Sequence, residues 1–228
     1  MPSTTNPEVF TDITVDPFVR GWLHWPARAG GDALVLTHGA GGNCNAPLLV
    51  ALAETFAAGG YLVLRCDLPY RQHRPYGPPG PGDAKRDRAG LQNALADIAK
   101  MTSGRAYLGG QSYGGRQCSF LCAEPERNPS QNIAGLLLIS YPLHPPGKPE
   151  QLRTQHFSSL RTPTLFVEGT RDPFGSIAEI EQAIKQIPGR TKLVPVEGVG
   201  HDLGFKGKAK RGELLARVLA EFQAFFRD

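Results

Sequence analysis

The sequence predicts an α/β fold in which helices cover both faces of a mostly parallel sheet. Apolar runs of strand length alternate with segments of helical periodicity along most of the 228 residues. Such alternation is typical of parallel strands that are joined by crossover helices. The 27 glycines and 20 prolines gather between these segments, where tight connections are expected. The chain is short enough for one hydrophobic core, so we expect a single domain over residues 1–228.

The first elements are expected to form one edge and the beginning of the parallel sheet. Val9 to Val15 and Phe18 to Trp25 read as strands that precede the strict alternation, which favours an antiparallel edge pair. Ala33 to Thr37 is a continuous apolar run and predicts a buried strand. Pro47 to Ala58 follows as a helix and Tyr61 to Cys66 as the next strand.

The middle of the chain continues the same alternation. Asp87 to Met101 has apolar residues near positions i, i+4 and i+7, which predicts a helix. Ala106 to Gly109 is a short strand, and the helix from Tyr113 to Ala123 follows it. Gly135 to Ser140 and Thr164 to Val167 are two further strands.

The last part of the chain completes the sheet without room for a large insertion. Ile177 to Ile187 and Glu213 to Phe226 are expected helices, and Lys192 to Val196 is an expected strand. Only 23 residues separate Ser140 from Thr164, and five of them are prolines, which disfavour long helices. We therefore expect no large cap domain and about one short helix around Glu150 to Leu160.

Composition and charge exclude several classes of protein. Hydrophobic residues make up 40% and charged residues 20% of the chain, as in ordinary globular proteins. The amino terminus lacks a signal-peptide pattern and no stretch has the length of a membrane span, so we expect a cytoplasmic protein without a membrane partner. Four cysteines are too few for a disulfide scaffold and are expected to be buried thiols.

Two basic segments explain much of the net charge of +4. Residues 71–88 and the segment around 206–211 carry lysines and arginines, but neither interleaves aromatic residues or contains a motif that reads nucleic acid. We therefore expect solvated loops and no nucleic-acid partner. The sequence also contains no metal-ligand cluster and no P-loop, so neither a metal nor a cofactor is expected.

The motif Gly-Gln-Ser-Tyr-Gly contains the expected nucleophile, Ser112. It follows the strand that ends near Gly109 and opens the next helix, the setting that holds a serine at a sharp, exposed turn. Glycines flank the serine because the tight turn brings neighbouring backbone too close for side chains. The alternative is a glycine-rich turn with a passive serine. Ligand sites in open α/β sheets lie at the carboxyl ends of strands, where this motif lies.

A serine hydroxyl needs a base to accept its proton and an acid to orient that base. Asp172 follows the strand at Thr164 to Val167, and His201 follows the strand that ends at Val196. Their order after Ser112 is the order of the α/β-hydrolase triad. Asp202 adjoins the base, but neighbouring side chains in an extended loop diverge, which makes it the less favoured acid.

Negative charge on a carbonyl oxygen needs fixed hydrogen-bond donors. The backbone N–H of Tyr113 is expected to be one donor, because it follows the nucleophile directly. The second donor is expected from the sequence His-Gly-Ala-Gly-Gly after the first inner strand, with Ala40 preferred and Gly41 as the alternative. His38 in the same loop is interpreted as a structural residue.

The proline-rich segment from Leu68 to Gly82 leaves the carboxyl end of a strand, so we expect it to overhang the site. Arg71 or Arg74 would then present a guanidinium that matches a substrate carboxylate. The alternative is that both arginines are solvated or hold the loop in place. His144 and His156 are candidates for the rim of the site, with structural roles as the alternative.

Five strings of the sequence carry a family resemblance: LTHGAGG, DLPYRQHRP, GGQSYGGRQ, YPLHPPGKPEQLRTQHF and PTLFVEGTRDPFG. With these motifs the chain resembles a family of small α/β-hydrolases that includes the testis-expressed protein thirty and a subunit of the nonspecific-lethal acetyltransferase complex. The resemblance covers nearly the whole chain after about residue 8. It implies the α/β-hydrolase fold and assigns Ser112, Asp172 and His201 to the catalytic positions. Dienelactone hydrolase is a more distant resemblance, since that family uses cysteine at the position of Ser112.

Three functional hypotheses follow from these residues. The first is a carboxylesterase that acts on small or short-acyl esters through a covalent acyl-enzyme. The second is a thioesterase or serine peptidase that uses the same triad. The third is a noncatalytic interaction module that retains the fold. The complete set of catalytic residues favours an enzyme with a small-molecule ester substrate, while the physiological substrate and the oligomeric state do not follow from the sequence.

Overall fold

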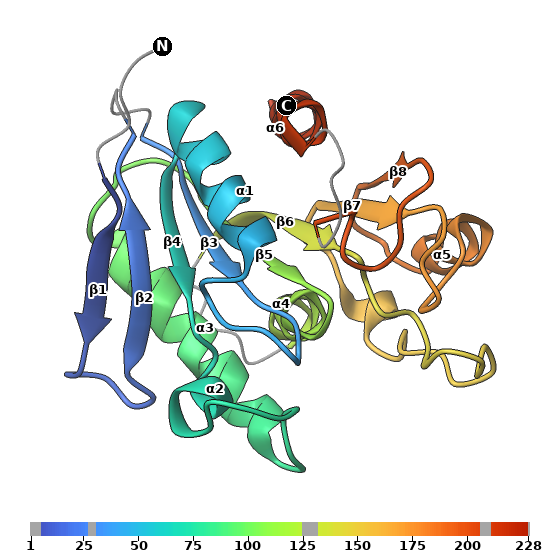
Figure 1. Ribbon diagram of the computed structural model, residues 1–228, viewed down its shortest axis with the longest axis horizontal. Coiled ribbons are helices and arrows are strands. Elements are labelled where there is room, and N and C mark those ends of the chain that lie inside the picture. The colour runs from blue at the N-terminus through green and yellow to red at the C-terminus, as the bar shows by residue number, and fades with distance from the viewer. Residues whose placement is uncertain (1–5, 27–30, 125–131, 206–210, 228) are drawn as a thin grey trace.

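Eight strands form one sheet in the part of the chain that the computed structural model describes, residues 6–26, 31–124, 132–205 and 211–227 (Figure 1). In chain order they are β1 (Glu8–Asp12), β2 (Val19–His24), β3 (Ala33–Thr37), β4 (Leu62–Cys66), β5 (Ala106–Gln111), β6 (Ile133–Ile139), β7 (Thr164–Gly169) and β8 (Thr191–Val196). Their order across the sheet is β1-β2-β4-β3-β5-β6-β7-β8. The pairs β1–β2 and β2–β4 are antiparallel and all other pairs are parallel, which confirms the expected antiparallel edge.

Six α-helices accompany the sheet in the described residues: α1 (Pro47–Ala58), α2 (Pro69–His73), α3 (Asp83–Ala99), α4 (Tyr113–Ala123), α5 (Ile177–Ile184) and α6 (Arg211–Phe225). Apolar side chains of α1 and α6 pack on one face of the sheet, and those of α3, α4 and α5 pack on the other. Figure 1 shows α1 and α6 on one side of the strands and α3 and α4 on the other. The expected fold class, a mostly parallel sheet with helices on both faces, is confirmed.

The inner strands contribute side chains to both halves of the core. In β3, Leu34 and Leu36 face the half formed with α1 and α6, whereas Ala33 and Val35 face the other half. This alternation follows from the two-residue period of a strand. Because both faces of the inner strands are buried, they read in the sequence as continuous apolar runs and not as alternating ones.

The structure differs from the expected elements at several ends and in one short helix. Helix α3 begins at Asp83, four residues before the expected start, because its first turn is polar and shows no apolar periodicity. Helix α2 was not expected; it has five residues and begins with Pro69, whose fixed φ suits the first helical position. The segment between β6 and β7 contains only a three-residue 3-10 turn, Phe157–Ser159, so no large cap covers the sheet there.

Two other expectations concern cysteines and membrane spans. Cys44, Cys66, Cys118 and Cys122 are all buried free thiols, as expected. None of the helices in the described residues combines the length and the apolar character that a membrane crossing requires. The basic residues at 206–210 lie outside the described residues, so the expectation of a solvated loop there stays a prediction.

Candidate active site

Ser112 lies at the turn between β5 and α4, in a backbone conformation that few residues other than glycine adopt (φ 51°, ψ −117°). Its N–H donates to the carbonyl of Ile139 on β6 (2.8 Å), and its own carbonyl accepts from the N–H of Arg116 (2.9 Å), which anchors the turn to the sheet and to the helix. A Cβ at Gly110 would lie 2.6 Å from the N atom of Gly115. The strand and helix approach each other so closely that only glycine fits, and Ser112 is held out at the top of the sheet.

Three side chains form a continuous hydrogen-bonded line at this turn. His201 Nε2 lies 2.8 Å from Ser112 Oγ, and His201 Nδ1 lies 2.7 Å from Asp172 Oδ2. The carboxylate can only accept, so Nδ1 carries the proton and Nε2 is left free to accept the serine proton. Asp172 is buried, and its Oδ1 also accepts from the N–H of Phe174 (2.8 Å). The histidine is therefore held in the tautomer that a general base requires.

The loops that carry this line are fixed by neighbouring contacts. The ring of Phe174 lies against the imidazole of His201, with 4.2 Å between ring centroids. Gln111 Nε2 donates to the backbone carbonyl of His201 (3.4 Å), which joins the end of β5 to the loop after β8. Asp202 points its carboxylate elsewhere, because Oδ1 accepts from the N–H of Gly204 (3.0 Å). Asp172, and not Asp202, is the acid on the ring nitrogen of His201.

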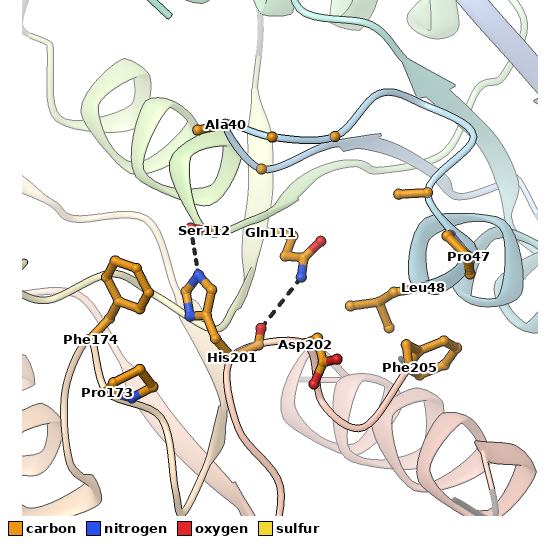
Figure 2. A pocket seen from close by; sticks show the side chains of 14 residues that line it. Ala40, Pro47, Leu48, Gln111, Ser112, Pro173, Phe174, His201, Asp202 and Phe205 are labelled. Atoms are coloured by element: carbon orange, nitrogen blue, oxygen red, sulfur yellow. Dashed lines mark hydrogen bonds between the residues drawn. The ribbon is translucent and has the colours of Figure 1, made fainter. Parts of the chain in front are cut away.

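A pocket of about 630 Å³ opens over Ser112 and His201. Gly39, Ala40, Gly41 and Gly42 line it beside these two residues, and its surface is mostly apolar. In Figure 2, Phe174 and Pro173 lie on one side of the Ser112–His201 pair, and Gln111, Leu48, Pro47 and Phe205 lie on the other. Substrate can thus extend from the serine toward two apolar walls.

The expected oxyanion donors are the N–H groups of Tyr113 and of Ala40 or Gly41. Ala40 and Gly41 line the pocket, and Tyr113 directly follows Ser112, which also lines it. Tyr113 is the first residue of α4, where a backbone N–H has no partner within the helix. The loop after β3 lies next to the nucleophile, since a Cβ at Gly39 would lie 3.4 Å from Ser112 Cβ. Both donor segments therefore flank Ser112.

The buried ring of His38 connects this loop to the segment after β4. The N–H of Leu68 donates to His38 Nε2 (3.1 Å), so Nδ1 carries the proton and donates to the carbonyl of Gly39 (2.9 Å). Burial lowers the pKa of His38, which favours the neutral ring that this pattern needs. This agrees with a structural role for His38.

A buried ionic network that the sequence analysis missed holds the far end of the loop. Arg65 on β4 donates to the carbonyl of Cys44 (2.6 Å), to Asn45 Oδ1 (2.7 Å) and to His24 Nε2 (2.8 Å). Burial and the charge of Arg65 lower the pKa of His24 to about 4, so the ring stays neutral and accepts this bond. Asp67 accepts from the N–H of Cys44 (2.7 Å). The sequence does contain a signal for this network: Arg65 lies within an otherwise apolar strand, and Asp67 follows directly after that strand.

The sequence analysis also missed Glu168, which lies at the end of β7 and is close enough to Asp172 to be affected by its charge. It is fully buried, its Oε1 accepts from the N–H of Tyr141 (2.6 Å), and Oε2 has no partner among the described residues. Burial raises the pKa of Glu168 well above its ordinary value, and the negative charge of Asp172 raises it further. The raised pKa of Glu168 favours the neutral form of this carboxyl beside Asp172.

A second serine–histidine pair lies inside the protein, with Ser119 Oγ 2.8 Å from His156 Nε2. The Ser119 hydroxyl donates to the carbonyl of Arg116 (2.9 Å), so it accepts from His156, the reverse of what a general base requires. His156 Nδ1 has no partner among the described residues, and Ser119 is fully buried. The ring stacks on Phe120 at 3.7 Å between centroids. This pair is structural, and His156 does not lie at the rim of the pocket.

Three side chains expected to bind substrate lie outside the pocket lining. Arg71 is buried, and its guanidinium donates to four backbone carbonyls, so it has no free fork for a carboxylate. Arg74 pairs with Asp83 on α3. His144 is buried and its Nδ1 lies 2.8 Å from the carbonyl of Pro145. The expectation of a carboxylate clamp is corrected: the two arginines hold the loop after β4, which was the alternative, and His144 has a structural position.

The order of the strands, the turn at Ser112 and the loops after β7 and β8 define the class, which is the α/β-hydrolase fold. A family model described as "Alpha/beta hydrolase domain" matches residues 30–227, and the chain belongs to this family.

Several solved structures share this fold over nearly their whole length. A dienelactone hydrolase from Anabaena variabilis is 20% identical, with a TM-score of 0.70 and coverage of 98% of each chain. An alpha-beta serine hydrolase homologue from Coxiella burnetii is 17% identical, with a TM-score of 0.72 and coverage of 94% of this chain and 98% of its own. Est1E from Butyrivibrio proteoclasticus is 17% identical, with a TM-score of 0.69 and coverage of 98% and 100%. At such identities the likeness concerns the fold.

Proposed function

We propose that this α/β-hydrolase is a serine carboxylesterase that cleaves small or short-acyl esters through a covalent acyl-enzyme. The observation that carries the proposal is the line from Ser112 through His201 to Asp172, with contacts of 2.8 and 2.7 Å, at the bottom of an open pocket. The neighbours named as a serine hydrolase homologue and as a dienelactone hydrolase support a hydrolytic reaction on this fold. The resemblance to the family of the testis-expressed protein thirty remains part of the proposal.

In the first half of the reaction, Ser112 Oγ attacks the carbonyl carbon of the ester while its proton passes to His201 Nε2. The charge that develops on the carbonyl oxygen is stabilised by the N–H of Tyr113 and by that of Ala40 or Gly41. Asp172 stabilises the imidazolium that forms. When the carbon–oxygen bond of the ester breaks, His201 gives the proton to the leaving alcohol and the acyl group stays on Ser112.

In the second half, water enters the position that the alcohol has left. His201 accepts a proton from this water, whose oxygen forms a bond to the acyl carbon. The bond to Ser112 then breaks, Oγ takes the proton back and the carboxylic acid leaves. No group beyond water and the described side chains is needed to balance either step.

A fluorophosphonate probe tests the proposal in one experiment, because it labels only a serine that has been activated. The wild-type protein should be labelled and should release p-nitrophenol from p-nitrophenyl acetate, and both signals should be lost in Ser112→Ala. Ser119→Ala is the matched control, since Ser119 also contacts a histidine but is buried, and it should remain reactive. Labelling that persists in Ser112→Ala and disappears in Ser119→Ala would assign the nucleophile to the other pair. A folded wild-type protein that is never labelled would favour the interaction module.

A further inference from the structure

Helix α2 lies directly against the loop that carries the proposed oxyanion donors. The hydroxyl of Tyr70 donates to the carbonyl of Ala40 (2.8 Å) and lies 3.4 Å from that of Gly39. Arg71 donates from Nη2 to the carbonyl of Ala40 (3.0 Å) and from Nε to that of Gly42 (2.7 Å). Both side chains are buried. The carbonyls of Ala40 and Gly42 therefore point toward α2, while that of Gly39, near Tyr70, also accepts from the N–H of Gly42 (3.0 Å) and from His38 Nδ1 (2.9 Å).

The direction of these carbonyls sets the direction of the N–H groups. In a trans peptide the C=O and the N–H point to opposite sides. The carbonyl of Gly39 shares its peptide group with the N–H of Ala40, and the carbonyl of Ala40 shares its own with the N–H of Gly41. Both N–H groups consequently point away from the side on which Tyr70 and Arg71 contact these carbonyls, and the same loop lines the pocket beside Ser112.

The other donor, the N–H of Tyr113, is connected to the same helix. The hydroxyl of Tyr113 donates to Asp87 Oδ2 (2.7 Å), and Asp87 Oδ1 accepts from the N–H of Tyr70 (3.0 Å). The rings of Tyr70 and Tyr113 also meet edge to face, with 5.8 Å between centroids. Asp87 is completely buried on α3. The two halves of the oxyanion hole are thus joined through α2 and one buried carboxyl.

We propose that Arg71, with Tyr70, is a positioning residue that orients the amides of Ala40 and Gly41 in the oxyanion hole. The inference rests on the proposed esterase function. Oxyanion donors are effective only when they are fixed at the place where charge develops, and a displacement of about 1 Å can cost on the order of 10²-fold in rate. Arg71 touches no substrate and acts through the loop.

The guanidinium is suited to this role because it is planar and its N–H donors point in fixed directions. Besides the oxyanion loop it reaches the carbonyls of Arg74 (3.0 Å) and Gly77 (2.8 Å), so it also holds the segment that follows α2. A lysine has a single nitrogen and cannot meet carbonyls in so many directions. A small cavity of about 220 Å³, bordered by Arg71, Arg20 and Asp67, opens behind the loop.

The test is steady-state hydrolysis of p-nitrophenyl acetate by Arg71→Ala, Arg71→Lys and Tyr70→Phe. Arg71→Ala should lower kcat by about 10- to 100-fold while KM changes by less than about threefold. Displaced oxyanion donors stabilise the transition state less but leave the binding of the ground state nearly unchanged. Arg71→Lys should recover part of kcat. Tyr70→Phe, which removes one hydroxyl, should lower kcat by roughly three- to tenfold.

Two further measurements separate positioning from mere stability. Guanidinium ion at millimolar concentration should enter the cavity behind the loop and restore part of the kcat of Arg71→Ala, but should leave Arg71→Lys unchanged. Binding of a trifluoromethyl ketone, which forms a tetrahedral adduct on the serine, should weaken in proportion to kcat/KM across the variants. Arg86→Ala is the matched control, since Arg86 is exposed and pairs with Asp16 far along the sequence, and its kcat should equal that of the wild type.

The outcomes separate this inference from the proposed function. A folded Arg71→Ala variant with wild-type kcat overturns the inference, as does a raised KM with unchanged kcat, which would mean that Arg71 affects substrate binding and not the transition state. If Arg71→Ala does not fold, Tyr70→Phe decides, and an unchanged kcat in that variant again overturns the inference. Should the wild-type protein neither react with the fluorophosphonate nor hydrolyse any ester, the proposed function and this inference fail together.

Discussion

At the scale of single residues, the backbone conformation of Ser112 and the tautomer of His201 both prepare the proposed proton transfer from the serine to the histidine. The positive φ of Ser112 holds its hydroxyl 2.8 Å from His201 Nε2, and the contact of 2.7 Å with Asp172 places the proton on the other ring nitrogen. In the proposed mechanism, the histidine needs both contacts to act as an efficient base. The three residues therefore act as one unit.

A first prediction follows from this dependence. Ser112→Ala and His201→Ala should each lower kcat by at least about 10⁴-fold, and the double variant should be little worse, because removal of either residue disables the same step. Asp172→Asn should fold normally and lose up to about 10⁴-fold in kcat, because the amide favours the wrong tautomer of His201. The measurements are kcat values for p-nitrophenyl acetate with circular dichroism as a folding control. A double variant whose loss equals the product of the single losses would contradict the assignment.

The second residue-scale prediction concerns the buried neutral carboxyl of Glu168. Its pKa is raised in the folded protein above the ordinary 4.5, so folding binds a proton that the unfolded chain releases as the pH rises. Stability contributed by the neutral group is complete below pH 4.5 and is lost above it. Glu168→Gln has the same shape and no proton to lose. Its stability relative to the wild type should increase above that pH by about 1.4 kcal/mol per pH unit, until the folded-state pKa is reached.

Urea unfolding of the two proteins between pH 4 and 8 measures this difference. A difference between Glu168→Gln and the wild type that stays constant over this range would mean that Glu168 is charged in the folded protein.

At the scale of elements, the approach of α4 to the end of β3 decides where the oxyanion loop lies. A Cβ at Gly114 would lie 2.4 Å from the carbonyl oxygen of His38 and 2.7 Å from Thr37 Cγ2. The helix that begins after Ser112 therefore rests on the backbone of the loop that we propose supplies the second oxyanion donor. The absence of a side chain at this position sets the distance between nucleophile and loop.

Gly114→Ala tests this contact against the ordinary effect of alanine in a helix. Alanine usually stabilises a helix by up to about 1 kcal/mol relative to glycine. Here the clash with backbone should instead destabilise the protein by about 1–3 kcal/mol and lower kcat, because the loop must move away from Ser112. Gly212→Ala is the matched control in α6, where a Cβ would meet no atom within 4 Å, and it should not destabilise the protein. Thermal unfolding and kcat are the readouts; equal effects of the two substitutions would refute a tight contact at Gly114.

The elements also show which parts of the structure a sequence can predict. The inner strands were predictable because both of their faces are buried, which requires a continuous apolar run. Helix α1 was predictable because one face is buried, which requires apolar residues at helical spacing. Helix α2 was not, because five residues are too few for a period and its two key side chains are polar. The sequence could not decide between a substrate-binding and a loop-holding role for Arg71, because all four of its partners are backbone carbonyls and the sequence gives no sign of where a carbonyl points.

At the scale of the whole molecule, the parallel sheet brings distant segments to one edge. The loops after β3, β5, β7 and β8 all begin at the carboxyl ends of their strands, and they supply Ala40, Ser112, Asp172 and His201 in turn. This is why the order of motifs along the chain was sufficient to predict that these residues lie close together. The sequence could not predict the roles of the buried residues Arg65, Asp87 and Glu168, because these roles depend on contacts with other elements of the fold. A single domain over residues 1–228 stays a prediction.

The open top of the sheet leads to the last prediction, on acyl-chain length. The segment between β6 and β7 forms only one three-residue 3-10 turn, and the described residues line a pocket of about 630 Å³ that opens to solvent. A long acyl chain gains about 0.8 kcal/mol for each methylene group that is buried, but methylenes beyond the walls at Leu48 and Phe205 would remain in water. We therefore expect kcat/KM for p-nitrophenyl esters, measured from acetate to palmitate below their aggregation limits, to be highest for short chains. A steady rise in kcat/KM beyond about eight carbons would require a long apolar tunnel and would contradict the role assigned to the missing cap.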